Sequence, residues 1–217
     1  MKRLIDMPRG GWILSCVSLS GIGVFIFAVA VLMGPYAEAV GDRRSELMCL
    51  QVAFTPARAA AVVQSFNPEA QRAIAALLVP GDVVFAFFYG LLLAGLVGLL
   101  ARCLDGAWRR AGAIAMWFPL VASCFDVIED LFLQSVVLQL INAPDATVSP
   151  MLTTFAGLAA TAKYIALCGL TPAYSIGGIA RGIRTSRRIS AWIVYALLIL
   201  VVVSICMPVI QQMPKCF

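Results

Sequence analysis

The chain has 217 residues, of which 62% are apolar and only 12% are charged. Soluble domains contain about half apolar and about a quarter charged residues, so this composition excludes an ordinary soluble domain and predicts an integral membrane protein. The net charge of +5 does not indicate nucleic-acid binding, because the basic residues gather at the ends of apolar segments, where Lys and Arg set membrane topology.

Five apolar segments are long enough to cross a bilayer, for which a helix needs about 20 residues. They predict one all-α transmembrane bundle over residues 1–217, embedded in lipid, and we expect it in a bacterial inner membrane. The predicted spans are 11–33, 83–101, 111–141, 151–180 and 190–210.

The first apolar segment, 11–33, follows three basic residues and precedes "AEA" at 37–39, which resembles a signal-peptide cleavage site. The apolar part of a secretory signal has about 7–15 residues, and this segment is longer. We therefore expect a retained span.

The connection 34–82 contains two helix starts. Thr55 stands before Pro56, and Asn67 stands before Pro68. Thr and Asn are favoured N-caps and proline is favoured at the first helical position. The pattern predicts two short amphipathic helices that stop at a Pro-Gly pair. They either cap the outer mouth of the bundle or lie on the membrane interface.

The basic residues predict the orientation of the spans. They concentrate in the N-terminal segment and in the connections 102–110 and 181–189, whereas the connection 142–150 has none. Short loops rich in Lys and Arg stay in the cytoplasm. The sequence therefore predicts a cytoplasmic N-terminus, an outside C-terminus and an outside connection 34–82.

The third span contains the stretch "SCFDVIEDLFL" at 123–133, with three carboxylates in apolar surroundings. Asp126, Glu129 and Asp130 are spaced i, i+3 and i+4, so a helix places all three on one face. A charge at the centre of a membrane helix costs roughly 2.5–3.5 kcal/mol, so such residues face the bundle interior and find partners.

The fourth span supplies a matching charge, Lys163. The third and fourth spans are antiparallel neighbours joined by a short loop, and a rise of 1.5 Å per residue puts both sets of charges about 18 Å below their outer ends. This depth predicts an ion pair of Lys163 with Glu129 or Asp130.

One lysine cannot neutralise three carboxylates. Either one or two of them are protonated, or an arginine of the outer connection reaches in, or a cation binds as a ligand. One interpretation is a buried salt bridge that only fixes helix register. The other is a polar site for a proton, a cation or a polar head group.

Three further residues are candidates to line this site. Asp82 and Tyr89 are seven residues apart on one face of the second span, and Tyr164 follows Lys163. Asp82 either caps its helix at the outer end or lines the entrance to the same cavity.

The seven cysteines occur singly, and the chain has no histidine. We therefore expect no metal site and no cofactor, since zinc sites and haem use His and Cys ligands. In the predicted topology Cys49 and Cys216 both lie outside, where thiols oxidise, so we expect a disulfide between them.

Three fragments together are similar to an uncharacterised family of small bacterial polytopic membrane proteins: "GDVVFAFFYGLLLAGL" at 81–96, "FPLVASCFDVIEDLFL" at 118–133 and "TAKYIALCGL" at 161–170. The resemblance covers about residues 47–170. It implies an Asp-x-x-Glu-Asn/Asp patch and an intramembrane Lys-aromatic pair. Asp130 stands where the family more usually has Asn, which adds a charge.

The sequence leaves three functions open. First, the buried cluster of Asp126, Glu129, Asp130 and Lys163 can bind or relay a proton, a small cation or a lipid-like ligand. Alternatively, the protein is an accessory subunit whose charges only fix helix packing, or a membrane enzyme that acts on a lipid or isoprenoid with Asp126 and Glu129 as acid and base. Five spans without an inverted repeat are few for a secondary transporter, so a homo-oligomer or a larger membrane complex also stays open.

Overall fold

Helices form the regular structure of this protein, and no β-strand occurs among the described residues. The computed structural model describes residues 1–27, 38, 40–145, 147–185, 189–212 and 216. Among them, four helical stretches are long and apolar enough to cross a membrane, and a shorter apolar helix covers Gly10–Gly23. The chain is an all-α, multi-pass membrane protein, as its composition predicts.

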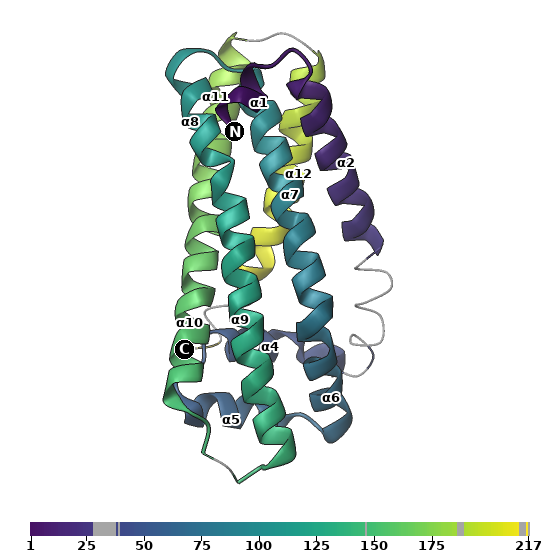
Figure 1. The fold of residues 1–217 in the computed structure, drawn as a ribbon, viewed down its shortest axis with the longest axis vertical. Helices are drawn as coiled ribbons and strands as arrows, with labels where there is room; N and C mark the ends of the chain where they lie inside the picture. The colour runs from purple at the N-terminus through teal and green to yellow at the C-terminus, as the bar shows by residue number, and fades with distance from the viewer. Residues whose placement is uncertain (28–37, 39, 146, 186–188, 213–215, 217) are drawn as a thin grey trace. The chain divides into compact units, whose positions relative to one another are not determined.

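Figure 1 shows the order of the helices along the chain. In chain order they are α1 (Lys2–Asp6), α2 (Gly10–Phe27), the 3₁₀ turn Gly41–Arg43, α4 (Arg44–Gln51), α5 (Pro56–Ser65), α6 (Pro68–Ala76), a π-type segment Leu77–Asp82, α7 (Val83–Arg102), α8 (Gly106–Ala115), α9 (Trp117–Asn142), α10 (Pro150–Tyr164), the π-helical turn Ile165–Leu170, α11 (Thr171–Thr185) and α12 (Ile189–Gln212).

Four predicted spans lie within helical stretches: α7, the α8–α9 stretch, the α10–α11 stretch and α12. The first predicted span begins with α2, and its residues 28–33 lie outside the described residues. The fourth differs in detail, because the π-helical turn Ile165–Leu170 interrupts it. The Thr171 hydroxyl donates to the Ala166 carbonyl at 2.8 Å, so this irregular turn keeps a buried acceptor satisfied.

The chain divides into two compact units. The first unit comprises Met1–Val24, Phe87–Ser123 and Tyr164–Met207, and the second comprises Phe25–Ala86, Cys124–Lys163 and Pro208–Phe217. A single domain over residues 1–217 stays a prediction.

In the first unit, α2 approaches the backbone of α7 at a glycine. A β-carbon added to Gly21 would lie 2.7 Å from Cβ of Leu92 and 3.0 Å from its Cα. Small residues allow such close approach of helices in membranes. At Gly23, two residues further along α2, an added β-carbon would meet no atom of the described residues within 4 Å.

We expect Gly21→Ala to lower the free energy of unfolding by up to about 2 kcal/mol. Overpacking against backbone costs about 1–3 kcal/mol, and the better helix propensity of alanine returns about 1 kcal/mol. Unfolding in mixed micelles would measure the change. Gly23→Ala is the matched control and is expected to be neutral or stabilising; equal losses in both variants would contradict the close contact.

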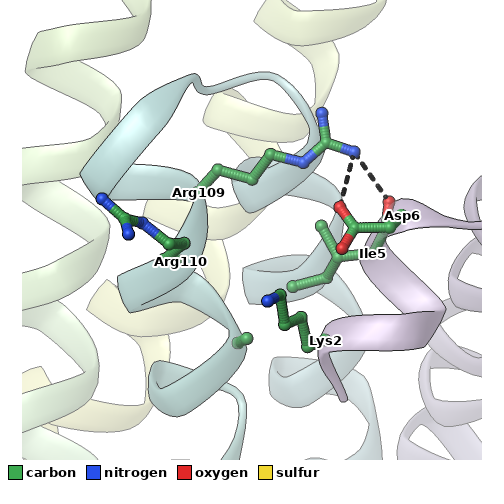
Figure 2. A pocket seen from close by; sticks show the side chains of 6 residues that line it. Lys2, Ile5, Asp6, Arg109 and Arg110 are labelled. Carbon is green, nitrogen blue, oxygen red and sulfur yellow. Dashed lines mark hydrogen bonds and ion pairs between the residues drawn. The ribbon is translucent and has the colours of Figure 1, made fainter.

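The N-terminal segment of the first unit is tied to the region around α8 (Figure 2). Arg102 Nη1 donates to the carbonyl oxygens of Ile5 at 2.6 Å and Met7 at 2.8 Å. Arg109 Nη2 lies 3.1 Å from Asp6 Oδ1, beside a small cavity. Two basic segments that the sequence assigns to the cytoplasm are therefore in contact.

In the second unit, both predicted helix starts are present. Thr55 Oγ1 accepts a hydrogen bond from Arg58 N at 3.4 Å, and Asn67 Oδ1 accepts one from Ala70 N at 2.8 Å. The helical geometry then breaks at Val79 (φ −136°, ψ 120°), just before a proline. Proline disfavours the helical conformation in the residue before it, which explains why the break precedes the Pro-Gly pair.

These short helices pack against α9 with their apolar faces, near the end at which α9 connects to α10 (Figure 1). The shared core contains Ala59 and Val63 of α5, Ala70 and Ile74 of α6, and Leu133, Val136, Val137 and Leu140 of α9. The short helices therefore lie against α9 in this unit, and the choice between capping the bundle and lying on the membrane interface stays a prediction.

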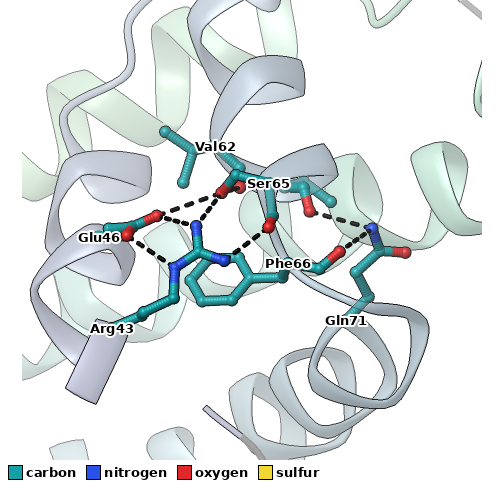
Figure 3. Close-up of polar contacts among 7 residues, drawn as sticks. Arg43, Glu46, Val62, Ser65, Phe66 and Gln71 are labelled. Carbon is teal, nitrogen blue, oxygen red and sulfur yellow. Dashed lines mark hydrogen bonds and ion pairs between the residues drawn. The ribbon is translucent and has the colours of Figure 1, made fainter. Parts of the chain in front are cut away.

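A polar network joins α4 to the end of α5 (Figure 3). Arg43 Nε donates to Glu46 Oε1 at 2.7 Å, and Arg43 Nη1 donates to the Ser65 carbonyl at 2.6 Å. The guanidinium lies 4.5 Å from the centre of the Phe66 ring. Gln71 donates to the Phe66 carbonyl at 3.0 Å, so side chains satisfy the C-terminal end of α5.

This network predicts a pH effect. The hydrogen bond from Arg43 lowers the pKa of Glu46 below its ordinary value of 4.5. A lowered folded-state pKa contributes stability above the unfolded value, and this is lost as the pH falls through the folded value. Thermal unfolding should therefore show a difference between wild type and Glu46→Gln that is constant above about pH 5 and shrinks in more acid solution.

The difference should stay below about 1 kcal/mol, because the Glu46 side chain is 39% exposed and water screens the pair. Glu69→Gln, at an exposed acid of α6, removes the same charge outside any ion pair of the described residues and is the control. A difference that grows on acidification would contradict the prediction.

Candidate functional site

Four ionisable side chains of α9 and α10 are buried in the second unit. The exposed fraction is 5% for Asp126, 0% for Glu129, 0% for Asp130 and 4% for Lys163. Glu129 lies as many residues before the end of α9 at Asn142 as Lys163 lies after the start of α10. The equal depth explains why the two helices bring these charges together.

Lys163 contacts two of the three carboxylates. Its Nζ lies 2.7 Å from Asp126 Oδ1 and 2.6 Å from Glu129 Oε2. The first contact is also a hydrogen bond, whereas the second is an ion pair without hydrogen-bond geometry. The sequence predicts an ion pair of Lys163 with Glu129 or Asp130. Lys163 contacts Glu129, and its second partner is Asp126 instead of Asp130.

Helix geometry explains this choice of partners. At 3.6 residues per turn, Glu129 lies about 60° to one side of Asp126 and Asp130 about 40° to the other side. Asp126 is thus the middle carboxylate of the three. A lysine that approaches from the Glu129 side reaches Asp126 and Glu129 but not Asp130.

Asp82 approaches the cluster from the other side. One carboxylate oxygen each of Asp82, Asp126 and Asp130 lie within 4.8 Å of one another. The sequence left open whether Asp82 caps its helix or lines the same cavity as the other acids, and the structure brings it to them. The second unit therefore collects four carboxyl groups around one ammonium group.

The cluster is unevenly paired. Both carboxylate oxygens of Asp130 and Oε1 of Glu129 are buried and have no hydrogen-bond donor among the residues that the structure describes. Among the described residues, no Lys or Arg forms an ion pair with Asp82 or Asp130. Carboxyl groups crowded in this way attract protons or cations, and carboxylate oxygens suit hard cations.

Two predicted lining residues belong to the first unit. Tyr89 is buried in α7 and Tyr164 is half-buried at the end of α10. The cluster itself belongs to the second unit. Their role in lining the site therefore stays a prediction.

A disulfide joins Cys49 of α4 to Cys216, with the two Cα atoms 4.9 Å apart. This separation is below the limit of about 7 Å for a bridge without backbone movement. Arg58 of α5 also donates a hydrogen bond to the Cys216 carbonyl. Both contacts fasten the C-terminal end to the short helices of the second unit.

Asp82 is the site residue whose role the sequence did not resolve. The available signal was its position at the start of an apolar span, where an acid also occurs as an ordinary cap. Comparison with protein families, curated proteins and solved structures gives no match to the chain, so the site rests on its own geometry.

Proposed function

We propose that this protein is a five-span membrane protein with a cytoplasmic N-terminus, in which the buried cluster binds an exchangeable proton or small cation. The role is binding or transport. The observation that carries the proposal is the excess of four carboxyl groups over one ammonium group, with Asp130 buried and in no ion pair with a described Lys or Arg.

The contact between the N-terminal segment and Arg102 supports the fifth span. If α2 did not cross the membrane, only α7 would separate these two segments, and they would lie on opposite sides. With α2 as a span, both lie on one side, and their basic residues indicate the cytoplasm.

The disulfide supports the remaining part of the topology. Cys49 follows the first proposed span and Cys216 follows the fifth. Four crossings separate them, so both lie on the outer side, where disulfides form and persist.

An ion-binding role explains why the cluster keeps uncompensated acids. A buried ion pair that only fixes helix register needs one acid for one lysine, and extra buried carboxylates would cost stability. An intramembrane cluster that exchanges a proton or cation needs a carboxyl group without a permanent partner. Asp130 meets that requirement.

Proteoliposomes test the proposal. Wild-type protein is expected to carry protons or cations across the membrane, and Glu129→Gln and Lys163→Met are expected to reduce the flux to the level of empty liposomes. Folding is scored separately by size-exclusion behaviour and thermal unfolding. Asp145→Asn, at an exposed acid in the connection between α9 and α10, is the control and should keep the flux.

The second candidate function is an accessory subunit. It is favoured by the two short contacts of Lys163, which pair most of the buried charge on α9. Absence of flux in wild type, together with misfolding as the sole defect of the variants, would establish this structural role. The same contacts disfavour an enzyme that uses Asp126 and Glu129, because a general acid must hold a proton that an adjacent ammonium group discourages.

A lipid-like ligand and a homo-oligomer belong to the same proposal. Polar head groups offer cationic groups that carboxylates bind, and a homo-oligomer would supply the additional spans that transporters commonly have. Cross-linking in native membranes would detect the oligomer.

A further inference from the structure

The cluster contains a set of ligands that is not explained by its ion pairs with Lys163. Asp82, Asp126 and Asp130 come from two different helical stretches, yet an oxygen of each lies within 4.8 Å of the others. Three carboxylates repel one another at such separations unless one of them is protonated or a positive charge lies between them.

From this geometry we infer that Asp82, Asp126 and Asp130 bind a divalent, oxygen-preferring cation such as Ca²⁺ or Mn²⁺. The inference rests on the proposed function and names the class of ion. A metal site at these carboxylates differs from the sequence-based prediction of no metal site, which is based on the lack of histidine and of paired cysteines.

The separations of the carboxylate oxygens leave room for an ion of this size. Two ligand oxygens on opposite sides of Ca²⁺ are about 4.6–5.2 Å apart, because each Ca–O distance is about 2.3–2.6 Å. Oxygens that lie within 4.8 Å of one another therefore fit around one ion. Carboxylate oxygens are the ligands that Ca²⁺, Mg²⁺ and Mn²⁺ prefer.

Asp130 provides an independent indication of a ligand. Its side chain has no exposed surface, and within the described part of the chain no N–H group or hydroxyl donates a hydrogen bond to either of its oxygens. A buried polar group without a partner is costly and rare in folded proteins. Since Asp130 is directed at Asp82 and Asp126, a cation among the three would satisfy it.

Charge favours a divalent over a monovalent ion. When ionised, the four carboxylates and Lys163 have a combined charge of −3, because one ammonium group faces four acids. A divalent ion lowers the excess to −1, whereas a monovalent ion leaves −2. Asp82 is the partly exposed member of the three and offers the point of entry.

Titration of the purified full-length protein with Mn²⁺ tests the inference. Loss of the electron paramagnetic resonance signal of free Mn²⁺ reports binding, and we expect one ion per chain with competition by Ca²⁺. Asp130→Asn should weaken binding about tenfold or more, because ligand charge sets cation affinity. Asp145→Asn should bind as wild type does.

Asp82→Asn should also weaken Mn²⁺ binding, and it replaces Asp130→Asn in the test if that variant does not fold. Absence of Mn²⁺ binding to wild type, or equal affinity in the wild type and the two site variants, would overturn the divalent site. The proposed function is judged separately, since proton flux in proteoliposomes without divalent cations would preserve it while the inference fails.

Discussion

Replacement of Lys163 by methionine is expected to lower the free energy of unfolding by about 3–5 kcal/mol. Lys163 is 4% exposed and is the ammonium group that contacts Asp126 and Glu129. Without it, two buried carboxylates lose their counter-charge while the apolar surroundings remain. Unfolding in mixed micelles, followed by circular dichroism, would measure the loss.

A double variant separates charge from packing. Glu129→Gln combined with Lys163→Met removes one acid together with the lysine, so it should recover a substantial part of the stability lost in Lys163→Met alone. Two results would show that the ion pair does not hold the two helices together. One is a Lys163→Met variant as stable as wild type, and the other is a double variant less stable than either single variant.

Removal of the disulfide is expected to give the second large effect. The bridge spans a sequence separation of 167 residues, and cross-links that close long loops restrict the unfolded chain most. We expect Cys49→Ser to lower the free energy of unfolding by about 2–4 kcal/mol. The comparison is made without reductant, where the bridge persists in wild type.

Cys124 supplies the control, because it is a free and exposed cysteine of α9. Cys124→Ser should keep both stability and the reductant-dependent mobility of wild type in denaturing gels. A reductant that cannot cross the membrane should cleave the bridge from the outer side of intact cells. Protection of the bridge from such a reagent would contradict the proposed orientation.

Much of the architecture follows from local patterns in the sequence. Thr55 and Asn67 form the predicted caps, because a cap depends on residues only three positions apart. The long helices also follow from composition, since apolar runs of sufficient length form helices in a membrane. The interruption at Ile165–Leu170 does not, because a π-helical turn leaves hydrophobic composition unchanged.

The buried cluster likewise has features that follow from the sequence and features that only the tertiary structure reveals. The sequence alone determined that Asp126, Glu129 and Asp130 share one face of a helix and that Lys163 reaches their depth, since helical period and rise are local constants. Only the tertiary structure decided that Lys163 contacts Asp126 and Glu129 while Asp82 joins Asp126 and Asp130. That outcome depends on how neighbouring helices are rotated about their axes, and rotation is set by the packing of side chains distant in sequence.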